Sequence, residues 1–209
     1  MILYIDTSSS YLYSAIYKDE KILSSIDEKL DKELSKKSLF LIKNMFDKLN
    51  ITPNDIDKIM VVNGPGSFTG IRVGLTIAKT FAWSMKKEII SISSLDAMAV
   101  SNNTNNFKIP LIDARRGYVY ASIRDKDNNI ILEDSYISID KLKEHLKDID
   151  NYDIITNDNI DYFDNLVNYT PNFKEVIDFY KDKKSENIFS LNPKYLKKTE
   201  AEEKYDNRN

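Results

Sequence analysis

The hydrophobic pattern at the start of the chain predicts three short antiparallel strands. Apolar residues form three runs separated by polar turn formers, at positions 2–6, 11–17 and 22–26. Strand-length apolar runs joined by short polar links are typical of a β-meander. Later runs of the same kind predict further strands at 59–62, 89–92 and 154–155.

Helical periodicity fills the segments between these runs. Residues 34–49 have apolar positions every three or four residues, so one helix face carries Leu34, Ser38, Leu41, Ile42, Met45 and Leu49. Phe40 lies on the other side of this helix, where a polar residue is expected. Ser93 is a suitable N-cap for a helix ending near residue 100, and 140–149 has the pattern of a charged amphipathic helix.

The helix predicted over 71–85 is apolar around most of its circumference. Its polar arc contains Arg72, Thr76, Lys79 and Thr80, with Trp83 among them. The other ~200° is apolar, whereas an ordinary surface helix has an apolar stripe of ~100°. A smooth ridge that another backbone can approach is formed by residues four apart, Gly70, Gly74, Ala78 and Ala82. This helix therefore needs cover on two sides, either within one fold or from another protein chain.

A glycine loop, Asn-Gly-Pro-Gly-Ser-Phe-Thr-Gly-Ile-Arg at 63–72, lies between the apolar run 59–62 and this helix. Four of the five glycines in the chain fall between positions 64 and 74. A strand, a glycine loop and a helix in this order can point backbone N–H groups at an anion. The loop lacks the Lys and the Ser or Thr that follow the last glycine of a P-loop, so a purely structural turn is an equal alternative.

A twelve-residue match indicates that one β-meander module is used twice. Residues 112–123 align with residues 5–16 without a gap, and five of the twelve pairs are identical. The match brings Asp113 onto Asp6, each at the end of a strand and facing an expected space between two lobes. If an anion or nucleotide binds there, the candidate residues are Asp6, Thr7, Ser8, Gly64, Gly66, Ser67 and Asp113.

The polar stretch 101–106 separates the two copies and marks the lobe boundary. We expect an N-terminal lobe at 1–103, a smaller C-terminal lobe at 104–199 and a frayed polar tail at 200–209. Residues 157–190 show no strong period, and structure is expected to resume at 191–196.

Composition narrows the possible functions. The 209 residues are 42% hydrophobic and 30% charged, which is typical of a globular protein. The net charge of −3 gives no sign of autonomous nucleic-acid binding. No apolar run approaches the ~20 residues of a membrane helix, and the first residues read as a strand, so we expect a cytoplasmic protein with no membrane contact.

Few catalytic side chains are available. The chain has no cysteine, and its one histidine, His145, lies in a charged helix. A histidine-based metal site and a Cys/His or Ser-His-Asp arrangement are therefore not expected. The pair Arg115 and Arg116 could neutralise an anion or pair with acidic groups across an interface.

Four segments together resemble the TsaB (YeaZ) family, the non-catalytic member of the bacterial machinery that makes threonylcarbamoyladenosine on tRNA. They are Ile-Asp-Thr-Ser at 5–8, Gly-Pro-Gly-Ser-Phe-Thr-Gly-Ile-Arg-Val-Gly at 64–74, Asp-Ala-Arg-Arg-Gly at 113–117, and 193–196 followed by Ala-Glu at 201–202. The resemblance covers about residues 1–125 and the C-terminal stretch, and it is poor across 126–190. It implies an α/β fold of the actin/Hsp70-like (ASKHA) type, in which each of two lobes is a mixed sheet led by a β-meander and the second lobe is reduced.

The same resemblance implies a scaffold function. It predicts that the chain binds a catalytic paralogue, TsaD, and an ATPase subunit, TsaE, and that it meets tRNA only indirectly when adenosine 37 is modified. The paralogue binds its metal through histidines on the helix corresponding to 34–49, which has none here. No cofactor is therefore expected on this chain, and ATP and metal are expected on the partner.

The implied interface lies on the helices at 34–49 and 69–85. It comprises Leu34, Ser38, Leu41, Met45, Gly70, Val73, Gly74, Ile77, Ala78, Phe81 and Ala82. A bare apolar surface of this kind predicts a homodimer when the partner is absent. The alternatives are a stand-alone actin-like ATPase or kinase that uses Asp6, the loop at 64–70 and Asp113, and, as the weakest, a peptidase.

Overall fold

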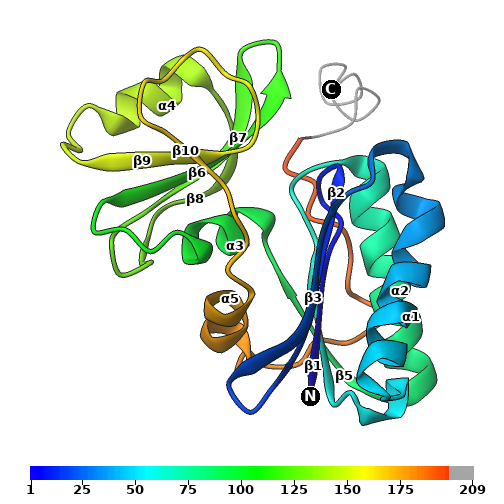
Figure 1. Cartoon of the computed structure of the whole chain (residues 1–209). Coiled ribbons are helices and arrows are strands. Elements are labelled where there is room, and N and C mark those ends of the chain that lie inside the picture. The colour runs from blue at the N-terminus through cyan, green and yellow to red at the C-terminus, as the bar shows by residue number, and fades with distance from the viewer. Residues whose placement is uncertain (198–209) are drawn as a thin grey trace.

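The computed structural model describes residues 1–197 and shows two five-stranded sheets, each with helices packed on it (Figure 1). The first sheet has the order β3-β2-β1-β4-β5. Its strands are β1 (Ile2–Asp6), β2 (Tyr11–Lys18), β3 (Lys21–Lys29), β4 (Lys58–Val62) and β5 (Glu88–Ile92). The predicted meander is confirmed, because β1, β2 and β3 pair antiparallel in succession.

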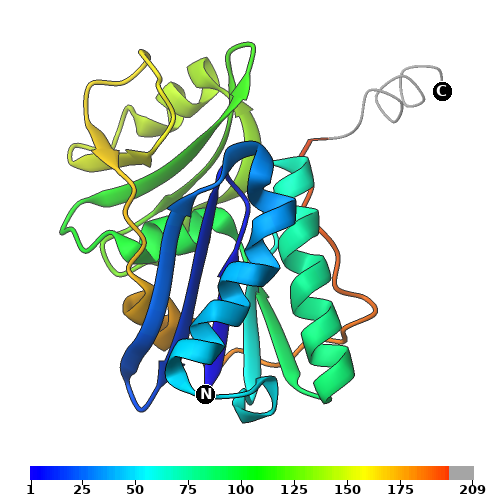
Figure 2. The ribbon, with the colours of Figure 1, turned by 45° about the vertical axis from the view of Figure 1, so that its right-hand side comes forward.

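Helices cover both faces of the first sheet. On one face lie α1 (Leu34–Leu49) and α2 (Phe68–Met85), side by side in Figures 1 and 2, with the Phe46 and Phe81 rings stacked at 6.0 Å. On the other face lie α3 (Ser94–Ser101) and α5 (Phe173–Tyr180). Two short 3-10 helices, Asp31–Glu33 and Pro53–Asp55, precede α1 and β4. Ser93 caps α3 as predicted, and α2 begins three residues earlier than predicted because Ser67 caps it.

The second sheet repeats the strand order of the first. Its order is β8-β7-β6-β9-β10, so a meander again forms one half and parallel strands form the other. Within residues 1–197, one helix, α4 (Ile139–Leu146), covers the face of this sheet that points away from α3. The strands are β6 (Phe107–Arg115), β7 (Tyr118–Arg124), β8 (Ile130–Ser138), β9 (Tyr152–Thr156) and β10 (Leu166–Asn168). The repeated module is therefore real: each lobe begins with a meander of three antiparallel strands.

The gapless sequence alignment of the two copies is wrong by one residue in the first strand of each copy, β1 and β6. Asp6 pairs with Tyr13, whereas Asp113 pairs with Val119, so the second hairpin is one residue shorter. A shift of one residue turns a strand's side chains to the opposite face. Ile5 accordingly packs under α1 and α2, while its sequence match Ile112 packs on the side of α3.

The end of the described chain returns to the first lobe. Residues 173–195 follow the second sheet in sequence but pack against the first: Val176 and Ile177 enter its core. The Glu186 N–H donates to the Ile89 carbonyl oxygen at 2.8 Å, and Lys194 N–H donates to Asn63 O at 2.8 Å. The tail expected at 200–209 lies outside the described residues. Within 1–197, no helix is both long and apolar enough to span a bilayer.

Candidate functional site

The glycine loop closes onto the turn between β1 and β2. The Ser67 N–H donates to the Ser8 carbonyl oxygen at 2.7 Å, and the Thr7 hydroxyl donates to Gly70 O at 2.7 Å. A Cβ atom on Gly66 would overlap the Ser8 carbonyl oxygen, and one on Gly70 would overlap the Thr7 carbonyl oxygen. The glycines are thus required for the close approach of two backbones. Between an anion cradle and a structural turn, these contacts favour the turn.

Asp6 is buried beside this loop. Its side chain is 3% exposed and accepts a hydrogen bond from the Ser8 N–H at 2.7 Å. Burial raises the pKa of the Asp6 carboxyl above its ordinary range, and the hydrogen bonds from Ser8 oppose that rise. An aspartate in this setting stabilises the turn after β1.

Asp6→Asn is expected to gain stability relative to the native chain as pH rises from 4 to 8. Because burial raises its pKa in the folded state, Asp6 contributes stability that is present below its unfolded pKa and lost as pH rises through the folded value. The amide lacks this titration. Urea unfolding of both proteins at the two pH values measures the difference, with exposed Asp140→Asn as control. A difference that stays constant or reverses would contradict the raised pKa.

Asp113 does not join Asp6 in one site. It is exposed and lies on the α4 side of the second sheet, two residues after Leu111 of the core beneath α4. Its carboxylate accepts the Arg115 N–H at 2.8 Å, and its own N–H donates to Asp158 at 2.7 Å. Asp6 instead lies on the α3 and α5 side of the first sheet, two residues after Tyr4. The two aspartates expected to face one another thus belong to different environments, and the one-residue register shift is the reason.

Most residues expected at a partner interface are inside the first lobe. Leu34, Ser38, Met45, Ala78 and Ala82 are 6% exposed or less. Gly70 and Gly74 are also buried, and a Cβ atom on either would overlap Thr7. The small-residue ridge therefore packs against the chain's own β1 and the turn that follows it, which corrects its expected position at the surface. Four residues of the expected set are half-buried: Leu41, Val73, Ile77 and Phe81.

The solvent face of α1 and α2 carries other large apolar side chains. Leu39, Phe40 and Trp83 are 53%, 62% and 65% exposed. The helical wheel already placed Phe40 and Trp83 among polar neighbours, which was the available signal for this face. Exposed Phe and Trp side chains on paired helices are of the aromatic type that is enriched at protein interfaces.

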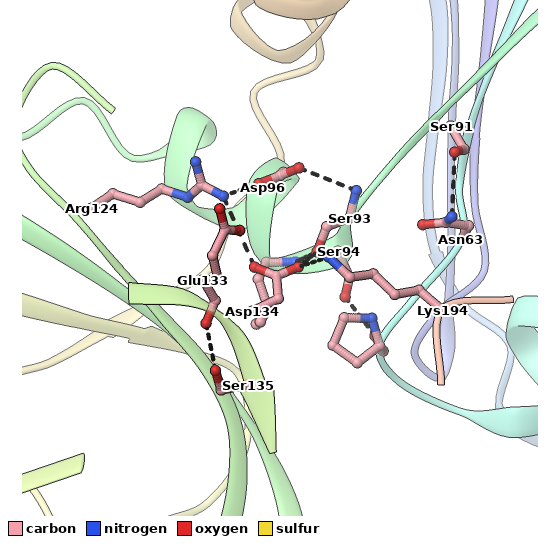
Figure 3. Close-up of polar contacts among 12 residues, drawn as sticks. Asn63, Ser91, Ser93, Ser94, Asp96, Arg124, Glu133, Asp134, Ser135 and Lys194 are labelled. Atoms are coloured by element: carbon pink, nitrogen blue, oxygen red, sulfur yellow. Dashed lines mark hydrogen bonds and ion pairs between the residues drawn. The ribbon is translucent and has the colours of Figure 1, made fainter. Parts of the chain in front are cut away.

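A buried polar network joins the two lobes, and no sequence pattern indicated it (Figure 3). Arg124, at the end of β7, forms an ion pair with Asp96 of α3 and lies 3.9 Å from an Asp134 carboxylate oxygen. Asp134 of β8 also accepts hydrogen bonds from the Ser93 hydroxyl and, at 2.7 Å, from Lys194. The Arg124 and Asp134 side chains are only 4% and 3% exposed. The network therefore fixes the second lobe against α3 and the C-terminal segment.

Comparisons with known proteins agree with this architecture. A family model described as TsaD, tRNA N6-adenosine threonylcarbamoyltransferase, matches residues 21–174. The tRNA threonylcarbamoyladenosine biosynthesis protein TsaB of Bacillus subtilis is 28% identical, over 98% of this chain and 97% of its own length. The TsaB protein of Buchnera aphidicola from Schizaphis graminum is 30% identical, over 86% of this chain and 92% of its own.

The solved structures show the same fold. YeaZ from Pseudomonas aeruginosa superposes with a TM-score of 0.74 at 16% identity, covering 92% of this chain and 98% of that one. The two-lobed actin/Hsp70-like fold with a reduced second lobe is thereby confirmed. Family model, relatives and fold converge, and the chain belongs to the TsaB (YeaZ) family of tRNA threonylcarbamoyladenosine biosynthesis proteins.

Proposed function

We propose that this chain is the non-catalytic subunit that binds a TsaD-type catalytic subunit and supports threonylcarbamoyl transfer to adenosine 37 of tRNA. The observation that carries the proposal is the solvent face of α1 and α2, with Leu39, Phe40 and Trp83 all more than half exposed. The proposal is supported by family membership and by likeness to a TsaD protein of Buchnera aphidicola, 23% identical over 49% of this chain.

The energetics favour a protein partner on this face. Full burial of a Phe or Leu side chain contributes about 1.5–3 kcal/mol, and interface anchors are most often Trp, Tyr or Arg. Leu41, Ile77 and Phe81 of these helices already pack against the lobe's own core. The partner therefore contacts the outer side chains and not the small-residue ridge.

The residues of this chain suit a scaffold better than a catalyst. Among residues 1–197, no three His, Cys, Asp or Glu side chains gather as metal ligands would. His145 is exposed on α4. Under this proposal the metal and ATP belong to the catalytic partner, TsaE joins as the ATPase subunit, and the same helix face pairs two copies of this chain when the partner is missing.

Phe40→Asp and Trp83→Asp are each expected to weaken capture of the catalytic subunit by about 30-fold or more, because loss of an interface anchor costs about 2 kcal/mol or more. Co-purification from cells and titration of the two purified proteins measure the effect. In cells, the threonylcarbamoyladenosine content of tRNA should fall with it.

Ile131→Asp on β8 is the matched control, because Ile131 is 58% exposed and lies in the other lobe. All three variants should retain the native unfolding midpoint. If both helix variants still captured the catalytic subunit at native strength, the interface would lie elsewhere and the proposal would fail.

A further inference from the structure

The hairpin between β6 and β7 ends in two exposed arginines held in left-handed backbone. Arg115, Arg116 and Gly117 have φ values of 66°, 57° and 76°, a conformation that non-glycine residues adopt rarely. Asp113 and Asp158 fix this turn by accepting backbone N–H groups. Within residues 1–197, no carboxylate lies within ion-pair distance of either guanidinium. The two positive charges at the hairpin tip are therefore not neutralised by ion pairs with residues 1–197.

Aromatic rings continue from the hairpin toward the first lobe. Tyr118 is 40% exposed and stacks on Tyr136 at 4.7 Å between ring centres. The Lys197 ammonium lies 5.4 Å from the centre of the Tyr136 ring. A stacked tyrosine pair with a cation above it is a surface on which an unpaired base can stack next to its phosphate.

The first lobe extends this surface. The Arg72 guanidinium lies 3.8 Å from the centre of the Phe68 ring, and its Nε donates to the Tyr195 hydroxyl at 2.8 Å. Phe68 and Tyr195 stack at 5.3 Å and are 53% and 45% exposed. The start of α2, the end of the described C-terminal segment and the β6–β7 hairpin lie at the same end of the molecule in Figures 1 and 2. We call Arg72, Tyr195, Lys197, Tyr118, Arg115 and Arg116 the basic–aromatic strip.

We propose that the basic–aromatic strip binds a single-stranded loop of the RNA substrate directly. The chain is rich in carboxylates and has a net charge of −3. The four cations of the strip nevertheless form no ion pair with a carboxylate of residues 1–197. Tyrosine faces and arginine planes next to one another are what splayed bases and phosphates require. An acidic protein partner would use the charges but would leave the stacked rings without a role.

The choice of RNA as the ligand rests on the proposed function. The experiment distinguishes failure of this inference from failure of that function. The probe is a fluorescently labelled RNA hairpin with a single-stranded loop, titrated by anisotropy against this chain alone and against its complex with the catalytic subunit. Arg115→Asn/Arg116→Asn removes two charges and keeps residues that tolerate left-handed backbone. We expect binding to weaken about tenfold at about 50 mM salt, and the slope of log affinity against log salt to become shallower by about 1–2.

Tyr118→Leu is a second variant with a different signature. It removes stacking and no charge, so binding should weaken at least about fivefold while the salt slope stays unchanged. Lys141→Gln/Lys147→Gln, on α4 and at its C-cap, is the charge-matched control and should leave RNA affinity native. Capture of the catalytic subunit should stay native in every variant.

Two results would overturn the inference. One is RNA affinity within twofold of native in both strip variants with an unchanged salt slope. The other is loss of catalytic-subunit capture in the strip variants with native RNA affinity, which would make the strip a protein interface. Neither result changes the outcome expected for Phe40→Asp and Trp83→Asp, so failure of the RNA inference is distinguishable from failure of the proposed function.

Discussion

Arg124→Met is expected to lower the free energy of unfolding by about 3–5 kcal/mol, the typical cost of removing one partner from a buried ion pair. Arg124 is 4% exposed, and its guanidinium contacts both Asp96 and Asp134. Methionine keeps much of the volume but leaves two neighbouring carboxylates in a buried place with Lys194 as the remaining cation. Because these groups come from α3, β7, β8 and the C-terminal segment, the loss should also loosen the contact between the lobes.

The stability lost in Arg124→Met should also depend on pH, which gives a second test. Burial raises the pKa of Asp96, and the Arg124 charge opposes that rise. Without Arg124, the pKa of Asp96 in the folded protein rises further. Asp96 is then protonated in the folded protein at low pH, and the variant loses stability as pH rises through this raised pKa. The deficit should therefore be smaller at pH 4 than at pH 7.

Urea unfolding at both pH values measures these effects, with Lys36→Met as control. Lys36 pairs with Glu33, but the two side chains are 73% and 45% exposed, so its loss should cost no more than about 0.5 kcal/mol. A deficit below about 1 kcal/mol in Arg124→Met, or one that grows at pH 4, would contradict a buried network that holds the lobes together.

The features that the sequence predicted well are those encoded by local patterns. The period of residues 34–49 matched α1 at both ends, because one face of that helix is core and the other is solvent. The meander, the Ser93 cap and the position of the glycine loop likewise depend on neighbours in sequence. The exposed Phe40 and Trp83 were visible as apolar residues at polar positions of a helical wheel, so the candidate interface was partly predictable.

The features that the sequence missed depend on contacts between distant residues. A wheel shows that α2 needs cover on two sides, but it cannot tell that Gly70 and Gly74 face Thr7 of the same chain. The alignment of residues 112–113 on 5–6 was wrong by one residue, because the two hairpins differ in length and the matched residues of β1 and β6 therefore point to opposite faces. Arg124 and Asp96 come together from separate lobes, and no spacing along the chain encodes that pairing.

The elements of segment 157–190 were not predicted, for a different reason. It contains β10 and α5, yet its periodicity is weak because α5 is only eight residues long and buries just two side chains fully, Val176 and Ile177. Its helix is fixed by packing against the first lobe and by the Asn172 cap, neither of which a local apolar count detects.

Gly70→Ala is expected to destabilise the protein by about 3 kcal/mol or more, the upper part of the range for overpacking, because the obstacle is backbone. Gly70 lies in the first turn of α2, and its Cβ would overlap the Thr7 carbonyl oxygen. Relief requires the β1–β2 turn to move away, which breaks the Thr7 hydroxyl bond to Gly70 O and the Ser67 bond to Ser8 O.

Backbone preference alone predicts the reverse ranking, and that makes Gly117→Ala the informative comparison. Alanine is favoured over glycine by about 1 kcal/mol within a helix, so propensity would make Gly70→Ala stabilising. Gly117 has φ of 76° with nothing within 4 Å of a Cβ, so there alanine should cost only about 1–2 kcal/mol of backbone strain. Urea unfolding of both variants decides between the two rankings. If Gly70→Ala proved neutral or stabilising, the loop would not close on the turn, and the glycine ridge would again be open to a partner chain.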